Sequence, residues 1–182
     1  MSERDPVRLF LALWPRPSLR GRLAAYRDAW HWPAGAKPVA DETLHLTLHY
    51  IGAFPRGGLA GLTESLAAVP VESMVLRPGG AEVWKGGIAV LRIAGDASLA
   101  ALHEGLAGVL ARFGIALDAR PFAPHVTLAR KAVRAEAPGD RPAFRWRASS
   151  FVLVESIPGG SARYEVLSRF GGRQARSDID SG

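Results

Sequence analysis

The 182 residues of this chain include no cysteine. Disulfide bonds, thiolate nucleophiles and metal sites built on cysteine ligands are therefore excluded. A chain without cysteine is typical of a reducing compartment, so we expect a cytoplasmic protein.

Long hydrophobic runs are also lacking. No apolar stretch approaches the roughly 20 residues of a membrane-spanning helix, so we expect no membrane partner. The N-terminal stretch "VRLFLALW" could be mistaken for the apolar part of a signal peptide. It is interrupted by Arg8, is followed by "PRP" and has no small-residue cleavage site, so we interpret it as a buried strand.

Positive charge is carried almost entirely by arginine, because lysine is scarce. The 23 Lys and Arg residues exceed the 17 Asp and Glu residues, which gives a net charge of +6. This excess either serves solubility alone or attracts an anionic partner such as a nucleotide or RNA. Guanidinium groups match the geometry of phosphate oxygens, which favours the second reading slightly.

Histidine and threonine are scarce too, yet both recur in one pattern. The chain has five His and four Thr, and two of each lie in "HLTLHY", which begins at His45, and "HVTLAR", which begins at His125. At these frequencies two His-x-Thr sequences are expected by chance in about one chain in a hundred or fewer. A single His-x-Thr is usually ordinary structure, but this repetition calls for an explanation.

Apolar periodicity predicts alternating strands and helices. We expect strands at 7–13, 43–51 ending at Gly52, 71–76, 81–84, 88–93, 125–130, 144–155 and 163–170. We expect helices at 17–30, within "GGLAGLTESLAAVP" and at 97–113. "RPGG", "KGG" and "SIPGGS" predict turns, and "HWPAGAKP" predicts a loop. The stretch from Gly171 onward has no apolar pattern, so we predict a disordered tail at 171–182.

The two motifs occupy matching places in these elements. A strand, a helix and the His45 strand follow one another in the first half, and a strand from Ile88, a helix and the His125 strand do so in the second. Such a repeat of whole units indicates a duplication. We therefore predict an α+β fold of two pseudo-symmetric lobes at 1–170, with two antiparallel sheets and outer helices around a central cleft.

Each motif presents one imidazole and one hydroxyl on the same face of a strand. His45 and Thr47 point one way, as do His125 and Thr127, because side chains alternate along a strand. Two imidazoles that titrate near neutral pH can act on opposite sides of a phosphorus atom, one taking a proton from water and the other giving one to the leaving oxygen. The Thr hydroxyls can donate to the phosphate oxygens. The residues alone do not say which His is the acid.

The remaining histidines are weaker candidates for a catalytic or metal-binding role. His49 shares the predicted face of His45, but two His without a nearby carboxylate or Cys make a poor zinc site, so we expect no metal and no cofactor. We expect His49 on the cleft floor or facing solvent. We expect His31 and His103 to be structural or exposed.

The motifs resemble those of the two-histidine phosphoesterase superfamily. The similarity is greatest to its RNA 2′,3′-cyclic phosphodiesterases, historically called 2′-5′ RNA ligases. It rests on "RLFLALWP", "LHLTLHYIG", "RPFAPHVTLAR", and "FVLVES" followed by "YEVL", and it runs from about residue 7 to 170. The resemblance implies a bilobal α+β fold and metal-independent hydrolysis of the 2′,3′-cyclic phosphate at an RNA end to a 2′-phosphate.

The resemblance also implies roles for individual residues. His45 would protonate the departing 3′ oxygen, His125 would activate water, and Thr47 and Thr127 would bind the phosphate. Arg130 stands where the family has a phosphate-contacting Arg, and Tyr50 where it has an aromatic residue that can stack on a base. Simple alternation puts Tyr50 and Arg130 on the face opposite to their motif His, so they can reach the ligand only at the strand end or beyond a bulge.

Two other functions remain open from the sequence. The first is a phosphodiesterase for another small cyclic or 2′-5′ nucleotide, and the second is a nucleotide- or RNA-binding module without activity. The expected partners are RNA ends or small nucleotides, the expected state is monomeric, and the relevance of reverse ligation is left open.

Overall fold

The computed structural model describes residues 5–159 and 163–172. Its strands are β1 (Pro6–Leu13), β2 (Lys37–Pro38), β3 (Leu46–Pro55), β4 (Met74–Trp84), β5 (Ile88–Ala94), β6 (His125–Arg130), β7 (Trp146–Ala148), β8 (Ser150–Ile157) and β9 (Arg163–Gly171). Its helices are α1 (Pro17–Asp28), α2 (Leu59–Ala67) and α3 (Ala97–Arg112), with short 3₁₀ turns η1 (Asp41–Thr43) and η2 (Arg56–Gly58).

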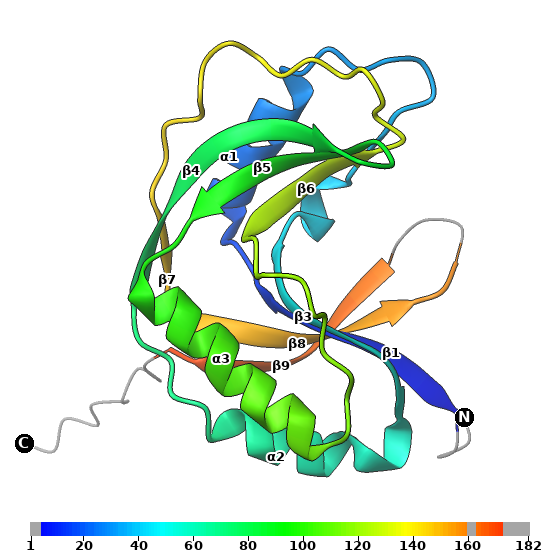
Figure 1. Ribbon diagram of the computed structural model, residues 1–182, viewed down its shortest axis with the longest axis vertical. Coiled ribbons are helices and arrows are strands. Elements are labelled where there is room, and N and C mark those ends of the chain that lie inside the picture. The colour runs from blue at the N-terminus through cyan, green and yellow to red at the C-terminus, as the bar shows by residue number, and fades with distance from the viewer. Residues whose placement is uncertain (1–4, 160–162, 173–182) are drawn as a thin grey trace, which may run out of the picture.

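The strands form one continuous antiparallel sheet in the order β7-β4-β5-β6-β3-β1-β8-β9, with β2 beside β6. The sheet curls so that β4, β5 and β6 face β1, β3 and β8 (Figure 1). The predicted α+β class is confirmed, but the prediction of two separate sheets is wrong. Pairing of Leu46 on β3 with Val126 on β6 joins the two groups of strands.

From this junction the sheet extends by a similar series of strands on each side. Outward from it lie β3, β1, β8 and β9 on one side, and β6, β5, β4 and β7 on the other. The motif strands are therefore the two innermost. β4 of the first half lies with β5, β6 and β7, and β8 and β9 of the second half lie with β1 and β3.

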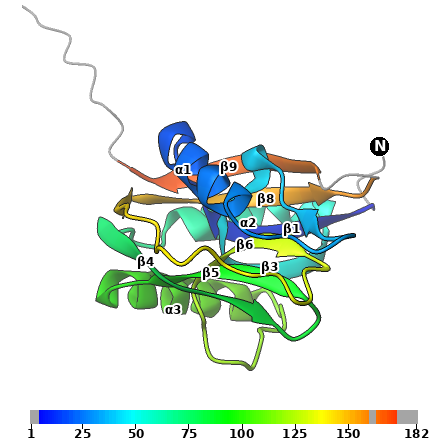
Figure 2. The same cartoon turned by 90° about the horizontal axis from the view of Figure 1, so that it is seen from above.

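The helices shield the outer faces of the sheet. α3 packs against β3, and α2 packs against β9 and α3. α1 lies on the side of the molecule opposite to α3 (Figure 2). The helix predicted at 97–113 is found as α3. Its buried side chains are Leu99, Leu102, Leu106, Val109 and Leu110, whereas Phe113 follows the last helical residue and is half-buried. Each fully buried leucine contributes about 1.5–3 kcal/mol relative to an exposed one, so this helix fixes the outer side of the motif strand.

Several predicted boundaries are wrong because tertiary pairing overrode local signals. "RPGG" lies inside β4, where a register irregularity between Pro78 and Ala81 accommodates it. The strand predicted at 144–155 is two strands, because β7 pairs with β4 while β8 pairs with β1. β3 continues past Gly52, where its pairing with β1 has a register irregularity. The φ of Gly52 is +80°, a conformation that glycine adopts easily because it has no Cβ.

The predicted loop at "HWPAGAKP" contains the short strand β2. Gly171 is the last residue of β9, so the disorder predicted at 171–182 does not include Gly171; residues 173–182 of that prediction lie outside the described residues. Within the described residues, none of the helices has the length and apolar character needed to span a bilayer.

Candidate active site

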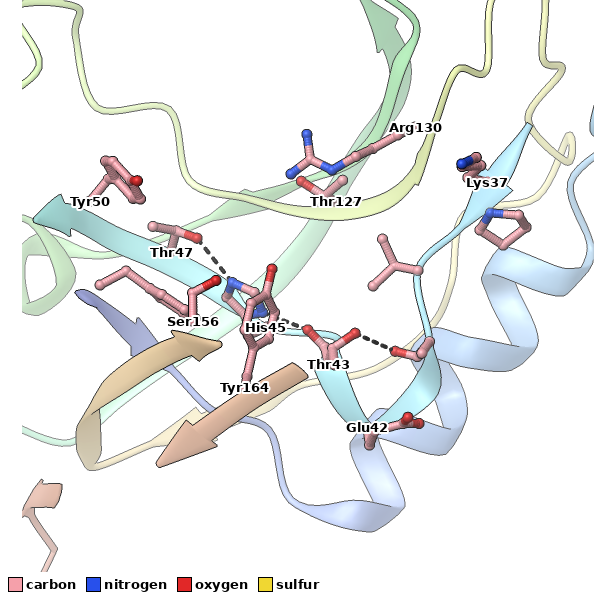
Figure 3. A pocket seen from close by; sticks show the side chains of 14 residues that line it. Lys37, Glu42, Thr43, His45, Thr47, Tyr50, Thr127, Arg130, Ser156 and Tyr164 are labelled. Carbon is pink, nitrogen blue, oxygen red and sulfur yellow. Dashed lines mark hydrogen bonds between the residues drawn. The ribbon is translucent and has the colours of Figure 1, made fainter. Parts of the chain in front are cut away.

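A cavity of about 520 Å³ opens where β3 and β6 meet, and residues of both motifs line it. This volume lies in the range of small-molecule sites, roughly 300–1,000 Å³. Its lining includes His45, Thr47, Tyr50, Thr127 and Arg130 (Figure 3). His125 is half-buried on β6 and is not part of the lining itself.

The single β3–β6 pair fixes how the two motifs face each other. Leu46 pairs with Val126, and the strands are antiparallel. His45 and Thr127 therefore lie on one side of this pair, and Thr47 and His125 lie on the other. Leu46 and Val126 are fully buried while the four polar residues are half-buried, so the polar groups share the face opposite to the core.

The backbone fixes the tautomer of His45. Its Nδ1–H donates to the carbonyl of Thr43 at 2.5 Å. Because a carbonyl can only accept, the proton lies on Nδ1 and the Nε2 atom of the neutral ring is free to exchange a proton. Nε2 lies 3.1 Å from the Thr47 Oγ1. Thr43 in turn donates its hydroxyl to the Ala40 carbonyl at 2.9 Å, which holds the η1 turn in place.

His125 is held in the same way. Its Nδ1–H donates to the carbonyl of Ala123 at 2.7 Å. The acceptor again lies two residues before the histidine, so both motifs orient the imidazole by the same local contact. Both rings therefore keep Nε2 for chemistry.

A bulge in β3 explains how Tyr50 reaches the same face of the strand as His45 and Thr47. The pairing with β1 skips Leu48 between Thr47 and His49, so Leu48 is an extra residue. An extra residue shifts the alternation by one position. Leu48 and His49 are both buried, and Tyr50 returns to the face of Thr47, where it lines the cavity with 62% of its surface exposed.

The same bulge occurs in β6. The pairing with β5 skips Leu128 between Thr127 and Ala129. Leu128 and Ala129 are buried, and Arg130 is exposed and lines the cavity. The two bulges lie at equivalent positions of the two motifs, so Tyr50 and Arg130 reach the cavity from opposite motif strands.

The bulge also explains why the prediction for His49 is wrong. This residue is buried on the core side of β3 rather than in the cleft. Its Nε2–H donates to the His103 carbonyl at 2.8 Å, and its ring stacks on that of His103 with centroids 4.0 Å apart. His103 stacks in turn on Phe122, so it is structural, as expected. His31 is exposed in its loop, also as expected.

His45 lies among aromatic rings. Trp14 stacks on it with centroids 5.3 Å apart and an interplanar angle of 12°. Phe10 and Tyr164 lie at 4.9 and 5.5 Å. His125 has a different neighbour, the edge-on ring of Trp84 at 4.4 Å. The two imidazoles therefore share backbone geometry but differ in their surroundings.

These surroundings keep both imidazoles neutral in the free protein. Burial lowers the pKa of His45 to about 4, and the positive charges of Arg130 and, when it is protonated, of His125 act in the same direction. Burial also lowers the pKa of His125, with smaller contributions from Arg92 and Arg130. The negative charge of a bound phosphate would counteract these positive charges and raise both pKa values. Protonation of an imidazole would therefore become easier when an anion binds.

Several lining residues were not predicted from the sequence, among them Lys37, Ser156 and Tyr164. Ser156 on β8 and Tyr164 on β9 are cross-strand partners whose side chains both reach the cavity. Lys37 on β2 pairs with Arg130 on β6. "YEVL" is part of the sequence resemblance. The local sequence does not predict that Tyr164 lines the cavity, because the direction of its side chain depends on the register between β8 and β9.

The wall that carries Lys37 is fastened to α1 by a buried arginine. The guanidinium of Arg27 donates to the Val39 carbonyl and forms ion pairs with Asp28 at 2.8 Å and Asp41 at 2.7 Å. The Trp32 Nε1–H donates to the Arg27 carbonyl at 3.1 Å. These contacts fix residues 37–43 beside the motif strands.

Metal ligands do not gather in the described part of the chain. In residues 5–159 and 163–172, no three His, Asp or Glu side chains are grouped so that they could hold a metal ion. The acidic residue of the cavity wall, Glu42, lies apart from both Thr hydroxyls (Figure 3).

Sequence comparison places these motifs in a known family. A profile of the 2′-5′ RNA ligase superfamily matches residues 15–156, which include both His-x-Thr motifs. The chain belongs to the 2′-5′ RNA ligase superfamily. An RNA 2′,3′-cyclic phosphodiesterase from Escherichia coli K12 is 30% identical in an alignment of 176 residues that covers 91% of this chain and 97% of that protein. A Geobacillus stearothermophilus RNA 2′,3′-cyclic phosphodiesterase is 29% identical over 152 residues, 72% of this chain, and the chain spans only 46% of its length.

Solved structures of the superfamily share the fold. E. coli LigT complexed with 3′-AMP superposes with a TM-score of 0.77 at 27% identity, covering 92% of this chain and 98% of that one. A crystal structure described as a phosphoesterase superposes with a TM-score of 0.83 at 27% identity and the same coverage. The curled sheet of this chain is thus that of the superfamily.

Proposed function

We propose that the chain is an RNA 2′,3′-cyclic phosphodiesterase that opens the cyclic phosphate at an RNA end to a 2′-phosphate. One observation carries the proposal: two imidazoles with fixed tautomers and two Thr hydroxyls meet on one face of the β3–β6 junction, beside Arg130. The superfamily relationship agrees with this assignment.

The reaction needs one base and one acid. His125 Nε2 takes a proton from a water whose oxygen attacks phosphorus. The bond from phosphorus to the 3′ oxygen breaks on the far side, and His45 gives that oxygen its proton. The product is a 2′-phosphate with a free 3′ hydroxyl. A proton passes from His125 through solvent to His45 before the next turnover.

The surrounding hydrogen-bond donors stabilise the negative charge that develops on the phosphate oxygens. Thr47 and Thr127 donate to the non-bridging phosphate oxygens, and Arg130 supplies a positive charge where negative charge grows. Tyr50 provides an exposed aromatic face on which a base can stack. Two lobes that each contribute one motif, as a duplicated fold over residues 1–170 would, give the phosphate equivalent donors from two sides.

The test is hydrolysis of a short RNA that ends in a 2′,3′-cyclic phosphate, in the presence of EDTA. We expect full turnover, because the mechanism uses only side chains, and a product that carries a 2′-phosphate. Chromatography against 2′- and 3′-phosphate standards identifies the leaving oxygen. No turnover, or loss of turnover in EDTA that a divalent metal restores, would contradict the proposal.

The pH dependence of kcat/KM offers a second test. The productive form of the free enzyme has one imidazole protonated and the other neutral. Both pKa values lie below the ordinary value of 6.5, so this form is most populated below pH 6.5, and at higher pH the acid is lost. We therefore expect a bell-shaped profile with its maximum below pH 6.5 and a fall on the alkaline side.

The dependence of kcat should differ, because it reports the complex. The bound phosphate raises both pKa values, so kcat should decline at higher pH than kcat/KM does. Initial rates from pH 4 to 9 at constant ionic strength measure both, with circular dichroism to confirm folding at each pH. A kcat/KM maximum above pH 7, with chemistry rate-limiting, would be incompatible with this charge arrangement.

A further inference from the structure

Two cations lie side by side at one end of the cavity. Lys37 on β2 is the register partner of Arg130 on β6, and both line the cavity. Among the described residues, neither forms an ion pair with a carboxylate. A single phosphate at the Thr pair needs only one of these charges, so the second is available to another anionic group.

The backbone of Lys37 is held firmly. β2 is hydrogen-bonded to β6, and the Val39 N–H donates to the Leu128 carbonyl at 2.8 Å. The buried Arg27 fastens the same segment to α1 through Val39 and Asp41. The backbone of Lys37 is therefore already ordered beside the cavity, whereas a lysine on a loose loop would have to be ordered on binding.

The cavity offers different chemistry at its two ends. Figure 3 shows Tyr50 on one side of Thr47 and His45, with Arg130 and Lys37 on the other. Tyr50 presents an aromatic face and Lys37 an ammonium group, and the groups that would bind the cyclic phosphate lie between them. Glu42 also lines the cavity, but it lies apart from Lys37 in this view.

A ribose matches this arrangement. Its 2′ and 3′ oxygens carry the cyclic phosphate on one edge of the ring. The base on C1′ and the 5′ group on C4′ leave the opposite edge in diverging directions. When the cyclic phosphate is at the Thr pair and the base lies on Tyr50, the 5′ group points toward Lys37. At an RNA end this 5′ group is the phosphate that links the last nucleotide to the one before it.

We propose that Lys37 forms a subsite for the 5′-phosphate of the terminal nucleotide, next to Arg130, which serves the cyclic phosphate. This inference rests on the proposed function, because it takes the Thr pair as the site of the cyclic phosphate. It defines the preferred substrate as the end of an RNA chain or a 5′-phosphorylated nucleotide, rather than a nucleoside cyclic phosphate with a free 5′ hydroxyl.

Binding of product analogues tests the subsite without requiring turnover. Calorimetry would compare adenosine 2′,5′-bisphosphate with adenosine 2′-monophosphate, which differ only in the 5′-phosphate. We expect the bisphosphate to bind the wild-type protein at least about tenfold more tightly at low salt, as one charge-assisted contact provides. In Lys37→Gln this ratio should fall to about threefold or less. The control is Arg112→Gln, which removes one exposed positive charge from the last turn of α3 and should keep the wild-type ratio.

Kinetics with matched substrates separates this inference from the proposed function. Adenosine 2′,3′-cyclic phosphate with and without a 5′-phosphate should differ in kcat/KM by a similar factor, which Lys37→Gln reduces and which higher salt weakens. Hydrolysis of both substrates at equal rates, or equal binding of both analogues, would overturn the subsite and leave the proposed function standing. An unchanged ratio in Lys37→Gln would also overturn it. Hydrolysis of neither substrate would contradict the proposed function, and the binding ratio would then decide the subsite alone.

Discussion

Replacing His45 or His125 with Gln should lower kcat on an RNA 2′,3′-cyclic phosphate end by about 10²- to 10⁴-fold. This is the usual contribution of a positioned general acid or base. Gln keeps a polar side chain of similar reach but cannot titrate. Because both rings are half-buried and bonded to the backbone only through Nδ1, the fold should survive the change.

The pH profiles of the two variants should differ and assign the roles. Removing the base abolishes the acidic limb of the kcat/KM profile, so His125→Gln should retain only the alkaline decline. Removing the acid abolishes the alkaline limb, so His45→Gln should retain only the acidic decline. If the two patterns are exchanged, the roles of the two histidines are exchanged as well.

His31→Gln is the matched control, since this histidine is exposed and its contact with Glu136 is through the backbone. It should retain wild-type activity. Activity within about threefold of wild type in both His45→Gln and His125→Gln would rule out paired acid–base catalysis, given that a lost acid or base costs at least about 10².

Replacing Thr47 and Thr127 together with Val should lower kcat/KM by about 10²- to 10³-fold. A hydrogen bond to a charged group contributes about 1.5–3 kcal/mol, so losing two of them lowers the rate by at least about 10²-fold. Val is nearly isosteric with Thr and suits a strand, so the change removes the hydroxyl and little else. Each single variant should lose about 10- to 100-fold, because the remaining hydroxyl still contacts the phosphate.

The control for this pair is Thr63→Val, on α2 and away from the cavity lining. It should have wild-type kinetics. Steady-state rates and thermal unfolding of all four variants separate catalytic loss from instability. A double variant with near wild-type kcat/KM would show that the hydroxyls do not contact the reacting phosphate.

The sequence predicted the elements whose signals are local. α3 carries its apolar stripe within four turns, and the predicted helix differs from the observed one by a single residue at its end. The facing of His45 with Thr47, and of His125 with Thr127, follows from alternation over three residues and agrees with the burial pattern. The family assignment also needed only short stretches of sequence: the two motifs, "RLFLALWP", and "FVLVES" followed by "YEVL".

Predictions failed where the outcome depended on a distant strand. The residues that each bulge skips, Leu48 and Leu128, are ordinary strand leucines, and only pairing with β1 and β5 makes them extra. His49 became a core residue for that reason. The strand predicted at 144–155 divided because its two parts meet different neighbours.

By itself the sequence determined which chemistry is present: two imidazoles and two hydroxyls in equivalent motifs, without cysteine. Local alternation sufficed for that, because it needs no partner. Only the tertiary structure decided the surroundings of this chemistry. The β3–β6 pair brought the motifs together, the bulges turned Tyr50 and Arg130 into the cavity, and aromatic rings from β1 and β9 surround the half-buried His45. Strand register and burial are properties of the assembled sheet, so no single segment specifies them.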